Sequence, residues 1–194
     1  MAYTEIKSKR QEILEAAGFL FREKGYTATH MKDIAEKVNM EAASLYNHIN
    51  SKHEILSDLL MYIAHKFQNG MKNIVESSYS DFDKIKAIIA LHIRLTTENT
   101  HCISLLTQDW KHLKEPDLKA FRKIRMKYSE DFSQILQAAM DKGEIKKANP
   151  EITLNSILSS VRWLYDWYTV DNDISPVELE IQISDLLISG FSIR

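Results

Sequence analysis

The sequence predicts an all-α protein of about nine helices, and three observations lead to this prediction. Apolar residues recur at three- and four-residue spacing along most of the chain, as they do on the buried face of a helix. Only 5 Gly and 3 Pro occur among 194 residues, which disfavours a turn-rich sheet. Residues that cap helix N-termini precede several of the apolar stretches, namely Ser51, Ser80, Asn149 and Ser175.

The first 52 residues predict three helices. A helix over 6–24 has an apolar stripe and ends at Gly25, a residue that often terminates helices. The stretch 25–52 then reads as two short helices joined by a tight turn at Asn39, because Asn tolerates a left-handed backbone. Leu45 and Ile49 define the buried side of the second short helix, which begins at about Glu41. This is a helix-turn-helix pattern, whose second helix can lie in the DNA major groove.

The remaining residues predict a larger helical domain. A capping box at Ser51 opens a long helix that contains one interior Gly, Gly70, which a helix can tolerate. The boundary is expected near residue 52 without a flexible linker, with a DNA-binding domain over 1–52 and a ligand-binding and dimerisation domain over 53–194. The helices expected in this second domain cover 52–76, 81–99, 101–113, 116–142, 150–168 and 176–189.

Composition limits the class of protein. A hydrophobic fraction of 44% and a charged fraction of 27% are typical of a soluble globular protein. No apolar run approaches the ~20 residues of a membrane span, and no signal-peptide core is recognised near Met1. A single Cys102 fits a reducing compartment, so a cytoplasmic location is expected. The net charge of −2 gives no nucleic-acid signal, so a DNA-binding prediction depends on the motif.

No catalytic or metal-binding motif is recognised. The sequence has no phosphate-binding Gly-rich loop, no HExxH and no GxSxG. The residues His92, His101, Cys102 and His112 match no standard zinc spacing. We therefore expect no enzyme activity, no cofactor and no metal site.

The helix-turn-helix region resembles a known signature. The order Gly25, Thr29, Ile34-Ala35, Leu45-Tyr46, His48, Ser51-Lys52, Leu56 is similar to the DNA-binding segment of the TetR family of bacterial transcriptional regulators. Four positions depart from the usual pattern: Asn39, Met40, Glu41 and Ile49. Glu41 stands where Ser or Thr is usual, and it either caps the helix, the more common use of such a residue, or accepts a bond from a cytosine amino group.

The expected DNA contacts follow from the outward face of the second short helix and from the resemblance. Ala can touch a thymine methyl group and Asn can bond adenine, so three residues are candidates for base reading. The resemblance implies contacts to the DNA backbone from three others, and two residues before the preceding helix could cap it or contact phosphate. The candidates are Ala42, Ala43 and Asn47 for bases, Tyr46, His48 and Lys52 for the backbone, Thr29 and His30 at the helix start, and the outward Ser44 and Glu41.

Aromatic residues gather in the last third of the chain, together with arginines. They either pack in the core or form the wall of a ligand cavity with a few placed charges, and both alternatives stay open. The candidate ligand-binding residues are Trp110, Phe121, Arg125, Arg162, Trp163, Tyr165 and Trp167. The segment from Ser159 to Phe191 resembles TetR-type repressors of fatty-acid and steroid degradation, which respond to acyl-CoA thioesters. That resemblance implies a small hydrophobic effector of the acyl-CoA class.

The last two helices carry more apolar residues than one thin domain buries. The resemblance implies that they pair with their copies in a homodimer, with Ile157, Val161, Ile183 and Leu187 at the interface. A two-fold dimer would read a palindromic double-stranded operator with half-sites about 34–36 Å apart. The expected function is thus a ligand-responsive repressor. The alternatives are a sensor of aromatic or cationic drugs, with acids such as Asp166 in its pocket, and a helical enzyme or interaction module without specific DNA binding.

Overall fold

The computed structural model describes residues 8–168 and 174–191, and every regular element in these ranges is a helix. The all-α prediction is therefore confirmed for the described residues. The elements are α1 (Lys9–Lys24), α2 (Met31–Lys37), α3 (Ala42–Leu45), α4 (Lys52–Glu76), α5 (Asp81–Glu98), α6 (Thr100–Gln108), a 3-10 turn (Trp110–His112), α7 (Asp117–Asp141), α8 (Pro150–Arg162), α9 (Leu164–Trp167) and α10 (Pro176–Phe191).

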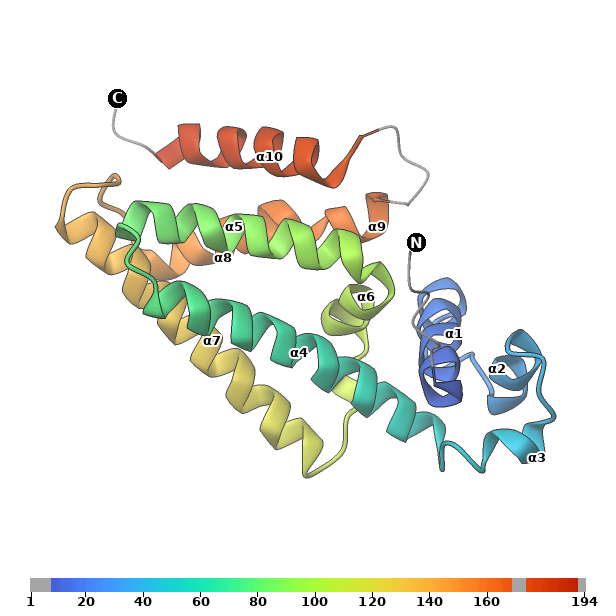
Figure 1. Cartoon of the computed structure of the whole chain (residues 1–194). Coiled ribbons are helices and arrows are strands. Elements are labelled where there is room, and N and C mark those ends of the chain that lie inside the picture. Colours follow the sequence, from blue (N-terminus) through green and yellow to red (C-terminus); the bar gives the residue numbers. More distant parts are fainter. Residues whose placement is uncertain (1–7, 169–173, 192–194) are drawn as a thin grey trace.

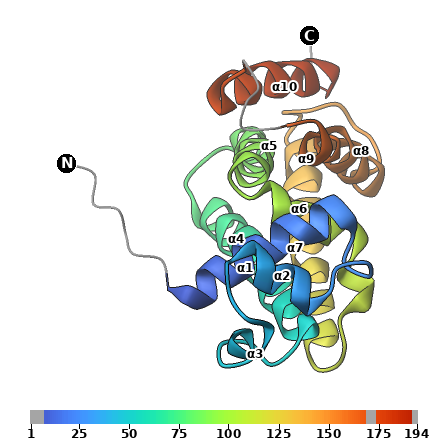
Figure 2. The same ribbon diagram turned by 90° about the vertical axis from the view of Figure 1, so that its right-hand side faces the viewer.

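Helices α1, α2 and α3 form one end of the molecule, and α4 leads from them into the larger helical body (Figure 1). There α4 packs against α5 and α7, and α7 packs against α8. Helix α10 lies along α5, on the side away from α4 (Figures 1 and 2). Helix α6 contacts both α1 and α4, so it is one of the elements through which the body touches the N-terminal helices.

Helix starts agree with the capping residues seen in the sequence. The Ser51 hydroxyl accepts a bond from the Glu54 amide (3.1 Å), and Asn149 accepts bonds from two amides of α8. One detail differs, because the Glu54 carboxylate bonds the backbone N–H of Asn50 (2.9 Å), not that of Ser51 as a reciprocal capping box requires. The expected helix over 150–168 is also interrupted at Trp163, which separates α8 from α9.

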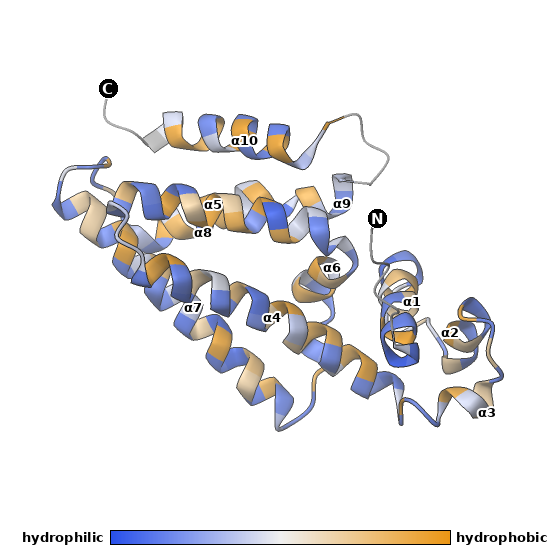
Figure 3. Ribbon diagram, viewed as in Figure 1, coloured by the Kyte–Doolittle hydropathy of each residue, from blue (hydrophilic) through white to orange (hydrophobic). Residues whose placement is uncertain are grey.

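Buried apolar residues form two clusters. One joins α1, α2 and the turn after α3 to the first half of α4, and it continues to Leu105, Leu113 and Phe121 of the body. The other fills the space between α4, α5, α7, α8 and α10. Long hydrophobic stretches interrupted by hydrophilic residues are visible along α4, α5 and α8 (Figure 3). Since the first cluster crosses residue 52, the division of the chain at that position stays a prediction.

Gly70 of α4 faces Leu91 of α5, and α4 continues through it without a break. A Cβ atom at this position would lie 2.6 Å from both terminal methyl groups of Leu91, a side chain that is itself buried. From the sequence alone, Gly70 was expected only to be tolerated within the helix. The packing explains why a glycine occurs there, because the Leu91 side chain occupies the space that a Cβ atom would need.

We expect Gly70→Ala to lower the free energy of unfolding by about 1–3 kcal/mol, because overpacking displaces Leu91 or separates α4 from α5. Thermal unfolding followed by circular dichroism measures this as a lower midpoint. Gly190→Ala in α10 is the matched control, since a Cβ there meets no atom within 4 Å. A midpoint for Gly70→Ala that rises as much as that of Gly190→Ala would mean that Leu91 moves aside without loss, because alanine favours the helix at both positions.

Candidate nucleic-acid interface and ligand cavity

The turn between α2 and α3 has the geometry that its sequence predicts. Asn39 has a φ of 53°, in the left-handed region, and its amide bonds the Glu36 carbonyl oxygen (3.1 Å). The Met40 amide closes the turn on the Ala35 carbonyl oxygen (2.9 Å). These two bonds close the turn that joins the two short helices, as in a helix-turn-helix.

One side of the segment that begins with α3 is buried and the other is exposed. Leu45 and Ile49 are 0% and 1% exposed, which confirms the predicted buried side. Ala42 is half-buried, at the edge of this side. The exposed residues are Glu41, Ala43, Ser44, Tyr46, Asn47 and His48. These side chains form an outward surface available to DNA, and their individual roles stay predictions.

Glu41 does not cap α3, although it occupies the N-cap position. Its side chain accepts no capping hydrogen bond, and the carboxylate is exposed. The capping interpretation that the sequence favoured is therefore corrected. The Glu41 carboxylate is exposed at the start of the recognition segment, and its contact with a base stays a prediction.

The structure also corrects the predicted role of Thr29 as a possible phosphate contact. Its side chain is 0% exposed, and the hydroxyl donates to the carbonyl oxygens of Gly25 (2.9 Å) and Leu20 (3.3 Å). The hydroxyl therefore fastens the loop before α2 to the end of α1 and is not presented to DNA. His30 remains exposed at the start of α2, where its backbone N–H donates to the Asp33 carboxylate (2.7 Å). That bond, with a smaller contribution from Lys24, lowers the pKa of Asp33.

Lys52 is directed into the protein. Its Nζ donates to the carbonyl oxygens of Tyr26 (2.8 Å), Thr27 (3.2 Å) and Thr29 (2.7 Å), and it lies 4.5 Å from the centre of the Tyr26 ring. Partial burial lowers the pKa of this ammonium group. A phosphate contact, which the resemblance implied, would require these bonds to be given up. These bonds instead hold the loop between α1 and α2 in place.

We expect Lys52→Met to destabilise this loop by about 1–3 kcal/mol, because three carbonyl groups lose their donor while the apolar stem is kept. Amide hydrogen exchange should accelerate in residues 26–38, and DNA affinity should fall as α2 and α3 lose their fixed position. Lys32→Met serves as control, because its ammonium makes only an exposed ion pair with Glu36 (3.7 Å). Unchanged exchange in Lys52→Met would show that the loop holds without the amine.

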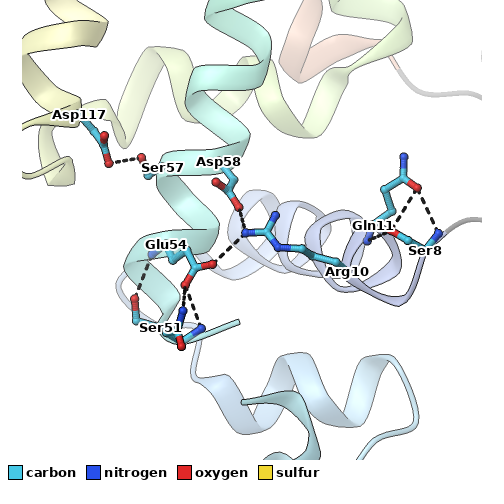
Figure 4. A network of polar contacts seen from close by, with 9 residues as sticks. Ser8, Arg10, Gln11, Ser51, Glu54, Ser57, Asp58 and Asp117 are labelled. Atoms are coloured by element: carbon cyan, nitrogen blue, oxygen red, sulfur yellow. Dashed lines mark hydrogen bonds and ion pairs between the residues drawn. The ribbon is translucent and has the colours of Figure 1, made fainter. Parts of the chain in front are cut away.

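Polar contacts fix α1 against α4 (Figure 4). The Arg10 guanidinium forms ion pairs with Glu54 (2.8 Å) and Asp58 (2.6 Å), two residues one turn apart on α4. One turn of α4 also faces the body, where the Ser57 hydroxyl donates to the Asp117 carboxylate of α7. The first two turns of α4 are thus tied both to the N-terminal helices and to the body.

A cavity of ≈ 200 Å³ lies within the body, among α4, α5, α6, α7 and α8. Its wall is mostly apolar, with two arginines and one hydrogen-bonded polar pair. The lining residues are Ala64, Phe67, His92, Thr96, Ile103, Leu106, Thr107, Phe121, Ile124, Arg125, Tyr128, Ser129, Leu158, Val161 and Arg162. No carboxylate occurs among these described residues.

The two arginines come from facing helices, Arg125 from α7 and Arg162 from the end of α8. Arg125 is exposed overall, but partial desolvation of its guanidinium, together with repulsion from Arg162, lowers its pKa. The Arg125 guanidinium lies 5.0 Å from the centre of the Trp110 ring and 5.8 Å from that of Phe121. Aromatic rings thus hold a cation beside a second cation, an arrangement that an anionic group would stabilise.

Only three of the seven ligand candidates line the cavity, namely Phe121, Arg125 and Arg162. Trp110 stacks on Phe121, with 6.1 Å between ring centres, and supports it from behind. The other three lie outside, as their contacts show. Trp163 and Trp167 pack on each other at 5.2 Å and are each 45% exposed, and the Tyr165 hydroxyl accepts a bond from Gln108 (3.2 Å).

Phe67, His92 and Tyr128 are among the lining residues that were not predicted from the sequence. The His92 Nε2 lies 2.8 Å from the Tyr128 hydroxyl oxygen, and the Phe67 ring contacts both of their rings. Burial lowers the pKa of His92 to about 4 and raises that of Tyr128, so both groups are uncharged at neutral pH. Their helical spacing placed them on inward faces, but that signal does not distinguish a core residue from a cavity wall.

The structure also corrects the interface candidates. Ile157, Val161 and Ile183 are at most 8% exposed and pack inside the protomer, and Leu187 is half-buried against the same cluster. Other apolar residues of α8, α9 and α10, and of the junction between α8 and α9, are exposed. They are Ile152, Trp163, Trp167, Val177, Ile181 and Leu186. Burial within the protomer thus contradicts an interface role for Ile157, Val161 and Ile183, whereas an interface role for Leu187 stays a prediction.

The described residues contain no group of three or more His, Cys, Asp and Glu side chains that could hold a metal ion. None of the helices formed by residues 8–168 and 174–191 is long and apolar enough to cross a membrane.

Comparison with known proteins gives two family matches. Residues 13–59 match the description "Bacterial regulatory proteins, tetR family", and residues 79–191 match "Tetracyclin repressor-like, C-terminal domain". The chain is 29% identical over 105 residues to the "HTH-type transcriptional repressor KstR2" of Mycobacterium tuberculosis. That alignment covers 54% of this chain and 52% of KstR2, so the chain spans about half the length of this relative.

Solved structures share the fold. The structure of the ketosteroid transcriptional regulator KstR2 of Mycobacterium tuberculosis superposes with a TM-score of 0.91, at 18% identity and with 100% of both chains covered. The structure of AibR in complex with isovaleryl coenzyme A and operator DNA superposes with a TM-score of 0.79, at 23% identity. It covers 94% of this chain and 97% of that one.

Proposed function

Because the chain belongs to the tetR family of bacterial regulatory proteins, and is thus a DNA-binding transcriptional regulator, we propose that it is a repressor released from its operator by a short-chain acyl-CoA. The observation that carries this proposal is the cavity with two arginines and no carboxylate among its described lining residues. An apolar wall suits an acyl chain, and the arginines suit the phosphates of CoA.

The size of the cavity favours a short acyl group. Its ≈ 200 Å³ is below the roughly 300–1,000 Å³ of sites that enclose a drug-sized ligand. A short or branched acyl chain would enter, whereas the CoA moiety would stay at the opening. The complex of AibR with isovaleryl coenzyme A supports this size class in a protein of the same fold.

The charge of the wall disfavours the alternative of cationic drugs. A cation would need a carboxylate beside it, and the acid that the sequence offered for this role, Asp166, is exposed and does not line the cavity. A cation would instead meet Arg125 and Arg162. Electrostatics therefore favours an anionic effector.

We propose that two copies assemble through α8, α9 and α10. The six exposed apolar residues of this region would be covered by the second copy, so that two α3 segments read a palindromic operator. Sedimentation velocity measures the mass. A monomer at all concentrations would contradict this assembly, and Leu186→Glu, at a position that is 75% exposed, should weaken it.

The proposed mechanism couples the cavity to α3 through contacts already described. Helix α4 contributes Phe67 to the cavity wall and Ser57 to the bond with α7, and its first turns bind α1 through Arg10. Helix α6 lines the same cavity and touches α1, where the His101 ring lies 5.5 Å from that of Phe19. An effector that binds the DNA-incompetent arrangement better, by typically ~1–3 kcal/mol, would release the operator.

The test is a thermal-shift series followed by an operator-release assay. Butyryl-CoA, isovaleryl-CoA, palmitoyl-CoA, free CoA, the matching acids and cationic dyes are compared. An effector at a hundred times its Kd should add about 2.7 kcal/mol of stability and displace a DNA site selected from a random pool. Stabilisation by dyes alone, or by acyl-CoA without release of DNA, would contradict the proposal.

A further inference from the structure

The wall of the cavity contains one polar pair away from its arginines. His92 of α5 and Tyr128 of α7 are joined by their 2.8 Å hydrogen bond, with Phe67 of α4 packed against both rings. All three side chains line the cavity. Neither His92 nor Tyr128 makes another side-chain hydrogen bond within residues 8–168 and 174–191.

In this pair, one hydrogen-bond donor has no acceptor, whichever tautomer His92 adopts. If the His92 Nε2 carries the proton, it donates to the Tyr128 oxygen, and the Tyr128 O–H has no acceptor. If Nδ1 carries the proton, the Tyr128 O–H donates to Nε2, and the Nδ1–H has no acceptor. A neutral imidazole has one N–H in either tautomer, so one donor remains unused in both cases.

We propose that His92 and Tyr128 recognise an uncharged oxygen acceptor on the buried part of the effector, and that they thereby select its chemical class. An apolar group that fills the cavity without such an oxygen would leave the spare donor buried and unsatisfied, which disfavours its binding. The pair thus distinguishes an oxygen-bearing ligand from a hydrocarbon of the same shape. This inference rests on the proposed function of the same cavity as an effector site.

The position of the pair gives the effector a direction. Tyr128 follows Arg125 by three residues on α7, so both side chains lie on the same face, about one turn apart. One ligand can therefore meet the arginines with an anionic group and the pair with a neutral oxygen. That oxygen is either the thioester carbonyl or a carbonyl or hydroxyl group on the acyl chain.

The first experiment is independent of CoA and uses two small probes, 2-pentanone and pentane, which differ in one carbonyl oxygen. Nitrogen-15 NMR of labelled histidine follows the ring nitrogens of His92 in the wild-type protein. The ketone should shift them and the alkane should not. In His92→Phe/Tyr128→Phe, the ratio of the Kd for pentanone to the Kd for pentane should rise about tenfold or more. Tyr128→Phe alone should give a smaller rise.

Tyr62→Phe is the matched control, because this exposed tyrosine of α4 does not line the cavity and its removal should leave the ratio unchanged. The inference is overturned if the ketone leaves His92 unshifted, if neither probe enters, or if the double variant keeps the wild-type ratio. Should the double variant not fold, the NMR shift and the Tyr128→Phe ratio decide.

A second experiment identifies the source of the oxygen. Butyryl-CoA, its thioether S-butyl-CoA and acetoacetyl-CoA share a four-carbon chain. Weaker binding of the thioether, about tenfold or more and reduced in Tyr128→Phe, assigns the thioester carbonyl. Tighter binding of acetoacetyl-CoA, also lost in Tyr128→Phe, assigns a chain oxygen. If no CoA ester binds while the ketone still shifts His92, the proposed acyl-CoA function fails and the inference stands.

Discussion

Ala43→Glu is expected to reduce operator affinity at least about 30-fold without changing the thermal midpoint. Ala43 is exposed on α3, on the side opposite the buried Leu45. A glutamate there would meet the phosphates and base edges of the major groove, and disrupting one base contact costs about 1–3 kcal/mol. A two-fold dimer carries the change twice, so the two losses add.

Fluorescence anisotropy with a labelled operator measures this loss at fixed salt, since affinity for DNA depends strongly on salt. Ala148→Glu is the matched control. It is the same change at an exposed alanine in the loop between α7 and α8, at the other end of the molecule from α3 (Figure 1). Equal affinities of the two variants would exclude α3 as the surface that reads DNA.

The second large effect is expected at the arginines of the cavity. Arg125→Gln/Arg162→Gln should raise the Kd for a short-chain acyl-CoA by about 100-fold or more. Each charge-assisted hydrogen bond to phosphate contributes about 1.5–3 kcal/mol, and the double variant removes two donors of this kind. Operator affinity should stay at the wild-type value, so the protein would remain on DNA at effector concentrations that release the wild type.

Isothermal titration gives the Kd, and the operator-release assay gives the response. Arg94→Gln is the control, because this exposed arginine of α5 does not line the cavity. A double variant that binds acyl-CoA as the wild type does would place the CoA phosphates elsewhere. A double variant that also loses operator affinity would indicate that the arginines act on the fold and not on the ligand.

The positions of the helices along the chain could be predicted to a large extent from the sequence. Helix starts depend on capping residues that lie within a few positions of the bonds they make, as Ser51 and Asn149 do. The turn at Asn39 depends on the backbone preference of one residue. The buried side of the second short helix follows from the spacing of Leu45 and Ile49. Such signals are local, so they survive in the sequence.

The effector cavity could be predicted only in part, because its wall joins five helices that are distant in sequence. An inward position on a helix is compatible with a core, a cavity wall or a partner interface. His92 and Tyr128 proved to line the cavity, Ile157 belongs to the core, and Trp163 lies on the surface. The aromatic residues in the sequence indicated a cavity near the end of the chain. Only the packing of α5 against α7 brings His92 and Tyr128 together in the cavity wall.

Periodicity and capping act over a few residues, so the all-α class, the helix-turn-helix and the exposed side of α3 follow from local sequence. The direction of Lys52, the burial of Thr29 and the lining of the cavity follow only from how the helices pack. A lysine that reaches solvent or folds back onto three carbonyl groups has the same neighbours in sequence. Which of these it does depends on how α1, α2 and α4 pack, and that packing is set by contacts between residues far apart along the chain.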